Sequence, residues 1–120
     1  MDSNVIIDYL GDKLPAKSTL LIERLPIIIS VITRIEIIGW YKATDQQIDK
    51  LTSFCSRAFI YPLNEEIILQ TINIRQKHKI KLPDAIIAAT AIMNKLTLIT
   101  HDVDDYSFVK DIEIIDSWRM

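Results

Sequence analysis

The chain alternates short, β-branched apolar runs with longer stretches whose apolar residues recur at helical spacing, and this alternation limits the folds open to it. Strands that alternate with helices pair in parallel, because a parallel return to the same sheet needs a long crossover. We therefore predict an α/β fold with three layers, in which a central parallel sheet is covered by helices on both faces. The predicted strands are residues 27–29, 59–61, 97–100 and 112–115.

The segments around these runs are predicted to form helices. Ser30 and Asn64 are favourable N-caps, because their side chains can accept hydrogen bonds from the N–H groups of a first turn. Pro83 is favourable in the first turn of the last helix, where the N–H that proline lacks would have no partner. The predicted helices cover residues 4–10, 17–25, 30–41, 44–57, 64–78 and 83–95.

The size and composition of the chain indicate a single domain over residues 1–120, and 49% hydrophobic residues are enough for a sizeable core. The apolar runs are far shorter than the roughly 20 residues that span a bilayer, and no basic-then-apolar leader opens the chain. We therefore expect a cytoplasmic protein with no membrane segment. The single cysteine, Cys55, excludes an internal disulfide and a multi-cysteine zinc site, and we interpret it as a core residue.

Acidic residues stand beside apolar runs at four places along the chain. Asp2 opens the first helix, Glu36 lies in the third, Asp84 opens the last, and Asp102 and Asp105 follow the third strand. Ligands of parallel α/β sheets bind beyond the carboxyl ends of the strands, where these carboxylates are expected to gather. Carboxylates at the edge of a core need positive charge beside them. Mg²⁺ or Mn²⁺, which prefer oxygen ligands, are the simplest candidates.

Each carboxylate by itself also has an ordinary structural interpretation. Asp2 could cap the first helix, and Asp84 could stabilise the dipole of the last one. Glu36 could lie on the solvent face of an amphipathic helix, and residues 102–105 could form a solvated acidic loop. Against the dipole interpretation, the helix behind Asp84 is apolar on nearly every face, which favours a buried helix whose first carboxylate points into a crevice.

The charge of the chain bears on nucleic-acid binding. A net charge of −2 and a pI of about 5.6 are unlike proteins that hold nucleic acid by electrostatics alone. Either the chain does not bind nucleic acid, or bound metal inverts the local field at an acidic pocket. A basic run precedes Asp84 and is either a solvated helix end or a contact for the phosphate backbone: Lys77, His78, Lys79 and Lys81.

Taken together and in order, four segments resemble the PIN-domain family, and in particular the VapC-type toxin ribonucleases. The segments are residues 2–10, 29–36, 82–91 and 98–106, and the resemblance covers essentially the whole chain. It implies a central parallel sheet with helices on both sides. It also implies a negatively charged pocket that holds one or two Mg²⁺ or Mn²⁺ ions.

The resemblance implies roles for individual residues. By motif, Asp2 and Asp84 would be the main metal ligands, and Glu36 would complete the site directly or through water. The fourth acid is either Asp102, slightly favoured as a metal ligand, or Asp105, and both stay catalytic candidates. The hydroxyls of two further residues could hydrogen-bond a ligand carboxylate: Ser3 and Thr100.

The implied activity is hydrolysis of RNA phosphodiesters by a metal-bound water. The resemblance further implies a homodimer that is the toxin of a type II toxin–antitoxin pair and is neutralised by a cognate antitoxin protein. Two alternatives are open. One is a catalytically silent PIN-fold module that binds RNA or a partner protein, and the other is a metal-dependent nuclease that acts on DNA flaps.

One departure from the family concerns the first strand. Related chains carry a few apolar residues before the first aspartate, whereas only Met1 precedes Asp2 here. Either the first strand is nearly absent, or the start is truncated or mis-assigned. Our hypothesis is a shortened start, which would leave the sheet open at its middle.

Overall fold

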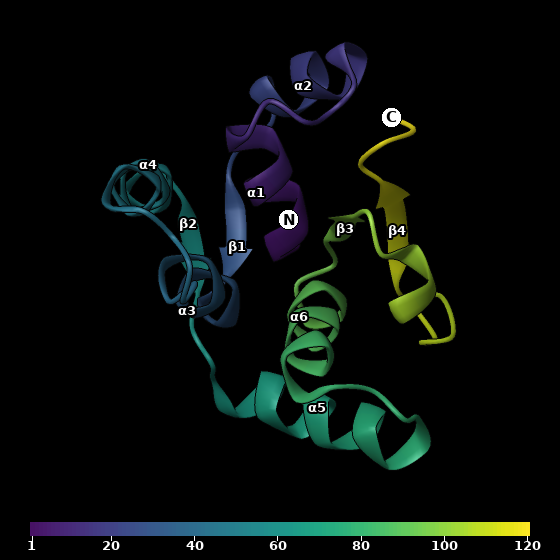
Figure 1. The fold of residues 1–120 in the computed structure, drawn as a ribbon. Helices are drawn as coiled ribbons and strands as arrows, with labels where there is room; N and C mark the ends of the chain where they lie inside the picture. Colours follow the sequence, from purple (N-terminus) through teal and green to yellow (C-terminus); the bar gives the residue numbers. More distant parts are fainter.

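The computed structural model describes residues 1–120 and contains helices and parallel strands in the predicted order (Figure 1). Each helix and strand lies within a few residues of its predicted bounds, so the α/β fold class is confirmed. The helices are α1 (Ser3–Leu10), α2 (Ala16–Glu23), α3 (Val31–Ile38), α4 (Asp45–Ser56), α5 (Glu65–Lys77) and α6 (Leu82–Met93). The strands are β1 (Ile28–Ser30), β2 (Phe59–Tyr61), β3 (Thr97–Thr100) and β4 (Glu113–Asp116), and a short 3₁₀ helix, η1, covers Val103–Asp105.

Side-chain caps fix the starts of several helices. Ser30 Oγ accepts a hydrogen bond from the Ile32 N–H at 3.2 Å, and Asn64 Oδ1 accepts one from the Ile67 N–H at 2.9 Å. Both predicted caps are therefore confirmed. The third helix ends earlier than predicted, at Ile38, and its last turn is closed by the Gly39 N–H, which donates to the Ile35 carbonyl at 2.8 Å.

The strands form two separate parallel pairs, β1 with β2 and β3 with β4, and no strand joins the pairs. The predicted central sheet is therefore open at its middle. The first two residues bridge the opening, because the Met1 ammonium donates to the Ile28 carbonyl at 3.0 Å and the Asp2 N–H donates to the Ile99 carbonyl at 2.9 Å. Burial lowers the pKa of the Met1 ammonium to about 6.

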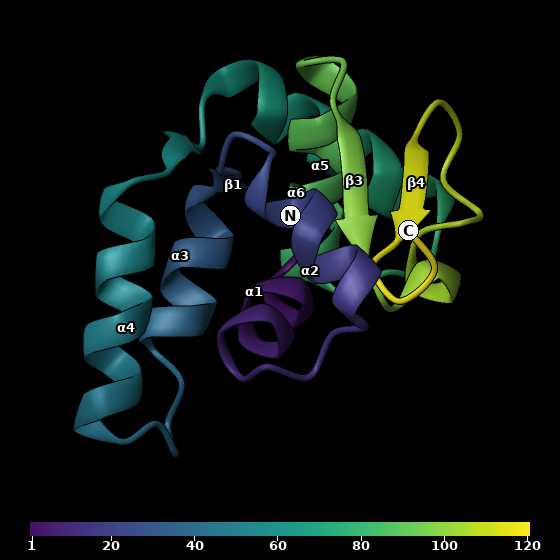
Figure 2. The ribbon, with the colours of Figure 1, turned by 90° about the horizontal axis from the view of Figure 1, so that it is seen from above.

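Helices cover both faces of β3. Leu98 belongs to a buried cluster with residues of α5 and α6, whereas Ile99, whose side chain points to the opposite face, packs with Val5 of α1 and Ile22 of α2. Figure 1 shows this order, with α1 and α2 above β3 and α6 and α5 below it, and Figure 2, from above, shows β3 and β4 side by side. A further cluster, around Phe54, joins α1, β1, α3 and α4.

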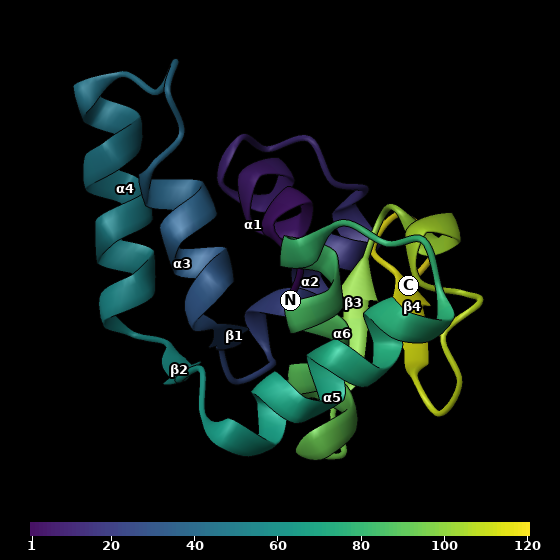
Figure 3. The same cartoon turned by 90° about the horizontal axis from the view of Figure 1, so that it is seen from below.

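The last long helix, α6, holds the two strand pairs together. Residues 85–91 of α6 are all buried, and several of them are alanines, so the helix backbone can approach its neighbours closely. Helix α6 contacts both β1 and β3, beneath the opening between them. Figure 3, from below, shows α5 packed across α6, with α3 and α4 side by side beyond β1.

Two expectations about burial and membranes can be compared with the structure. Cys55 is buried and free, as predicted, and burial raises the pKa of its thiol. No helix combines the length and the apolar character that crossing a membrane requires.

The core around Phe54 provides a test of the packing. Phe54 is 2% exposed, whereas Phe59 is 59% exposed and its ring centroid lies 4.8 Å from that of Tyr61. We expect Phe54→Ala to lower the free energy of unfolding by about 3–5 kcal/mol, because it leaves a cavity. The same change at Phe59 is expected to cost about 1 kcal/mol or less. Urea denaturation of both variants measures the difference, and equal losses would contradict the described core.

Candidate active site

The five candidate acids come from elements that meet beside the carboxyl ends of β1 and β3. Asp2 is the N-cap of α1, Glu36 lies on α3, and Asp84 is in the first turn of α6. Asp102 follows β3 after His101, and Asp105 ends η1. Hydrogen bonds through a few neutral side chains then connect most of these carboxylates to one another.

The carboxylate of Asp2 is the centre of this network. It is only 6% exposed, and its Oδ1 accepts a hydrogen bond from the Ser3 N–H at 2.7 Å, which starts α1. Its Oδ2 accepts hydrogen bonds from the Thr100 hydroxyl at 2.9 Å and from the Tyr106 hydroxyl at 3.0 Å. The expected capping role and the position in an acidic cluster are thus combined in one side chain.

Tyr106 connects Asp2 to Asp84. Its side chain is fully buried, and its hydroxyl lies 3.2 Å from Asp84 Oδ1 as well as 3.0 Å from Asp2 Oδ2. A phenol carries one proton, so this hydroxyl cannot donate fully to both carboxylates. Burial, followed by the two neighbouring negative charges, raises the pKa of Tyr106, which therefore stays protonated.

Asp84 lies in an unfavourable field for a negative charge. Burial raises its pKa first, and the negative charges of Asp2, Asp105 and Glu36 raise it further, while the hydrogen bond from Tyr106 acts in the opposite direction. The ion pairs of the structure all involve Asp116, which pairs with His101 and Arg119. No lysine or arginine therefore neutralises the carboxylates around Asp84.

Ser3 and Asn4 hold two more of the acids. The Ser3 hydroxyl donates to Glu36 Oε1 at 2.7 Å, across from α1 to α3. The Asn4 amide Nδ2 donates to Asp102 Oδ2 at 2.8 Å, while its Oδ1 accepts a hydrogen bond from the His101 N–H at 3.2 Å. The first turn of α1 therefore binds both the helix and the loop that carry these carboxylates.

The two candidates for the fourth acid have different surroundings. Asp105 lines a hollow with Asp84, and its charge contributes to the raised pKa of Asp84. Asp102 faces Asn4 instead, and its backbone N–H donates to the Thr100 hydroxyl at 3.1 Å. Asp105 is thus the neighbour of Asp84, and Asp102 is held on the side of Asp2.

The basic run predicted near Asp84 divides into two parts. Lys79 and Lys81 line the same hollow as Asp84 and Asp105, where they are exposed. His78 packs against Phe108, with ring centroids 5.0 Å apart. Two of the four basic residues therefore border the acids without pairing with them.

The donor set fits a hard divalent cation. Every candidate ligand is an oxygen, and burial raises the pKa of Asp84 first, followed by negative charges that a cation would neutralise. No three acidic, histidine or cysteine side chains converge closely enough to hold an ion as they stand. Asp2 and Asp84 are instead held together through the Tyr106 hydroxyl.

Two residues of this network were not predicted from the sequence. Asn4 lies in the segment that resembles the family, and its position two residues after Asp2, in the first turn of the same helix, was the available signal. Tyr106 is separated from Asp2 by 104 positions, so nothing in the local sequence indicates that its hydroxyl reaches that carboxylate. The His101 ring packs against Trp118, with centroids 5.0 Å apart, and its Nδ1 lies 3.3 Å from Asp116 Oδ1.

Comparison with known proteins identifies the family. A model of the PIN domain matches residues 1–110. The chain belongs to the PIN domain family. No curated protein matches the sequence.

Solved structures resemble this PIN domain over nearly its whole length. A toxin–antitoxin complex from Klebsiella pneumoniae contains a chain with 28% identity and a TM-score of 0.78, and the match covers 99% of this chain and 97% of that one. VapBC-1 from nontypeable Haemophilus influenzae has 25% identity and a TM-score of 0.80, with 97% and 95% covered. DNA-bound VapBC from Salmonella typhimurium, at 21% identity and a TM-score of 0.79 with 97% and 95% covered, shares the fold.

The Tyr106 hydroxyl offers a test of the network in the metal-free protein. Because the hydrogen bond from this hydroxyl opposes the rise in the Asp84 pKa, Tyr106→Phe is expected to raise that pKa further. NMR titration of the Asp84 carboxyl carbon in EDTA measures the change. Tyr9→Phe is the control, because Tyr9 bonds Glu23 and is remote from Asp84. An unchanged or lower pKa in Tyr106→Phe would contradict the described contact.

Proposed function

We propose that this PIN domain is a metal-dependent endoribonuclease that hydrolyses RNA phosphodiesters as the toxin of a type II toxin–antitoxin system. The observation that carries the proposal is the pair of Asp2 and Asp84, held on one phenol hydroxyl with no cationic side chain paired to either. Two ionised carboxylates this close repel each other, so added positive charge would stabilise the ionised pair.

Mg²⁺ or Mn²⁺ would be held by Asp2 and Asp84, with Glu36 and either Asp102 or Asp105 completing the site. When bound, such an ion lowers the pKa of a coordinated water and so supplies a nucleophile near neutral pH. The Thr100 and Tyr106 hydroxyls orient Asp2, and the Ser3 hydroxyl orients Glu36, so the ligand carboxylates are held in fixed directions.

The basic residues beside the site have a role in this proposal. Lys79 and Lys81 border the hollow that contains Asp84 and Asp105, so an RNA phosphate next to the site would meet positive charge there. This contact would offset the repulsion expected between an acidic chain and RNA.

The proposed partners are a second copy of the chain and an antitoxin protein. Support comes from the similar structures, because those from Klebsiella pneumoniae and Haemophilus influenzae are a toxin–antitoxin complex and VapBC-1. The proposed location is the cytoplasm, where RNA and such a partner would be met.

A second candidate is a silent PIN-fold module that binds RNA or a partner protein. It is favoured by one observation, that no three acidic side chains converge to hold an ion as they stand. Tight Mn²⁺ binding, measured by calorimetry, separates the two, because a silent module has no use for the ion. Cleavage of DNA flaps but not RNA would instead support a metal-dependent nuclease that acts on DNA flaps.

Substitution of Asp84 tests the proposed chemistry. We expect purified protein with Mn²⁺ to cleave members of a structured-RNA panel, and Asp84→Asn to reduce cleavage to the level seen with EDTA, because a main metal ligand is lost. Asp49→Asn, on the exposed surface of α4, is the matched control and is expected to cleave normally. Comparable cleavage by a folded Asp84→Asn protein would refute the assignment.

Metal binding should also be visible in stability. The pKa of Asp84 is raised in the folded state, so the folded protein binds its proton more readily than the unfolded chain does, and stability falls as pH rises through the raised pKa. A cation that binds only the folded state reverses this loss, by about 2.7 kcal/mol at 100 times its Kd. We expect Mn²⁺ at pH 7 to raise the Tm of the protein and to raise that of Asp84→Asn far less. Equal shifts would place the ion elsewhere.

A further inference from the structure

The hollow beside Asp84 and Asp105 contains more than carboxylates and lysines. Phe108 and Arg75 also line it, and its volume is about 480 Å³. Pockets that bind small molecules have volumes of about 300–1,000 Å³, so one nucleotide is of a suitable size for the hollow. An aromatic ring beside cations is the combination with which proteins hold an unpaired base and its phosphate.

The ring of Phe108 is presented on a turn that the core fixes on both sides. Tyr106 and Val109 belong to the buried cluster of α5 and α6, and the Val109 N–H donates to the Tyr106 carbonyl at 2.9 Å. Phe108, between them, is 44% exposed, although phenylalanine is among the residues most often buried. Its ring packs against His78, with centroids 5.0 Å apart. The fixed turn therefore holds an aromatic ring at the hollow, which reduces the entropy cost of stacking a base on it.

The cations of the hollow have no carboxylate partner. Arg75, Lys79 and Lys81 are exposed, and the ion pairs of the structure all involve Asp116 instead. The three cations come from α5 and the loop after it. A phosphate is therefore expected on the side of α5. The carboxylates of the hollow come from α6 and η1: Asp84, Asp104 and Asp105.

We propose that this hollow is a nucleobase subsite, in which Phe108 stacks on one unpaired base and Arg75 contacts a phosphate next to that base. The proposal rests on the proposed function, because it takes the bound molecule to be RNA. Asp84 and Asp105 line the same hollow, so the stacked base belongs to a nucleotide at or next to the cleaved bond. The subsite thus selects which phosphodiester of the RNA meets the acids.

The lining of the hollow favours a nucleotide over an apolar side chain of a partner protein. Phe108 and Ile80 are its apolar members, and the other residues that line it are charged. An apolar side chain would leave those charges without partners, whereas a nucleotide offers a flat ring to Phe108 and an anionic phosphate to Arg75. Phe59 lacks this setting, because it is 59% exposed and packs against Tyr61 but is not part of the hollow.

The test measures binding separately from cleavage. A fluorescent single-stranded oligoribonucleotide of mixed sequence is titrated with the protein in Ca²⁺ instead of Mn²⁺, beside copies in which one base at a time is replaced by an abasic residue. We expect one abasic position to weaken binding to the unsubstituted protein by about tenfold, as the loss of a base stack does. The same abasic position is expected to have no further effect in Phe108→Leu. Phe108→Trp is expected to keep the effect, because it keeps a flat ring.

Two control variants match these changes. Phe59→Leu makes the same substitution at an exposed ring outside the hollow, and it is expected to show the full abasic effect. Arg75→Gln is expected to weaken the binding of every oligoribonucleotide alike and to reduce its salt dependence, because a phosphate contact carries no base specificity. Lys50→Gln, on the exposed surface of α4, is the control for that loss of charge.

Binding and cleavage together separate this proposal from the nuclease proposal. Equal abasic effects in Phe108→Leu and in the unsubstituted protein, or no abasic effect at any position, would overturn the base subsite whether or not RNA is cleaved. Coupling between Phe108 and one base without Mn²⁺-dependent cleavage would support the subsite and overturn the nuclease. If the protein cleaves RNA, an unchanged KM in folded Phe108→Leu would also overturn the subsite.

Discussion

The burial of the Asp2 carboxylate without a cationic partner constrains the whole molecule. One side chain caps α1 through the Ser3 N–H and accepts hydrogen bonds from Thr100 at the end of β3 and from Tyr106 beyond η1. The backbone N–H of the same residue bonds to Ile99. Because a buried charge must be hydrogen-bonded, α1, β3 and the segment after η1 are held in one arrangement, and the acids of α3 and α6 are brought up to it.

The same arrangement explains why stability and the proposed activity oppose each other in this domain. Asp84, at the start of α6, lies beside Asp2 and shares its only phenol donor. Burial and then the neighbouring negative charges raise the pKa of Asp84, so the ionised carboxylate is less stable in the folded protein than in water. A pocket built in this way is poised for a cation, and the uncompensated field is the property that attracts it.

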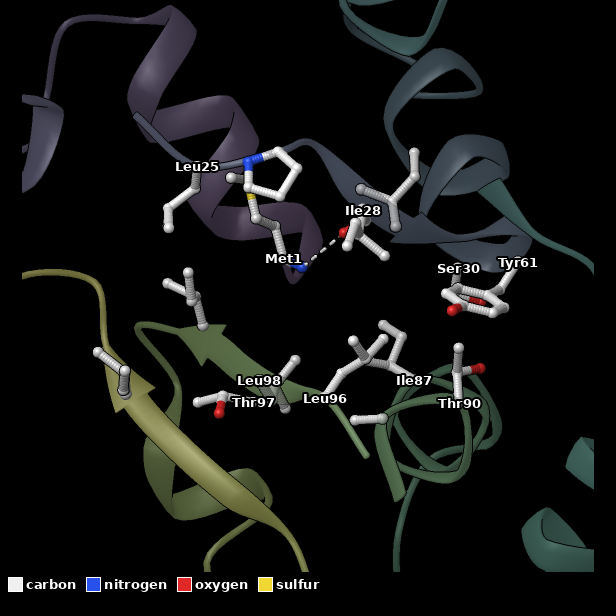
Figure 4. Close-up of a pocket in the computed structure, with 15 residues that line it drawn as sticks. Met1, Leu25, Ile28, Ser30, Tyr61, Ile87, Thr90, Leu96, Thr97 and Leu98 are labelled. Carbon is white, nitrogen blue, oxygen red and sulfur yellow. Dashed lines mark hydrogen bonds between the residues drawn. The ribbon is translucent and has the colours of Figure 1, made fainter. Parts of the chain in front are cut away.

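Helix α6 and the first two residues connect the two strand pairs. The two strand pairs share no strand, yet α6 contacts both, and the first two residues bridge them through backbone bonds. An apolar slot lies between the strand pairs, and Ile87, Thr90 and Ala91 of α6 line it (Figure 4).

The order of helices and strands, the caps at Ser30 and Asn64, and the parallel pairing followed from the sequence, because these depend on local hydrophobic period and on side chains that bond to the nearest turn. The grouping of acids could be anticipated from their positions after strands and at helix starts. Only the tertiary structure decided that Tyr106 joins Asp2 to Asp84 and that Asp105, not Asp102, neighbours Asp84. Those contacts join positions far apart in the chain. Because the packing of helices and strands sets them, no local sequence pattern encodes them.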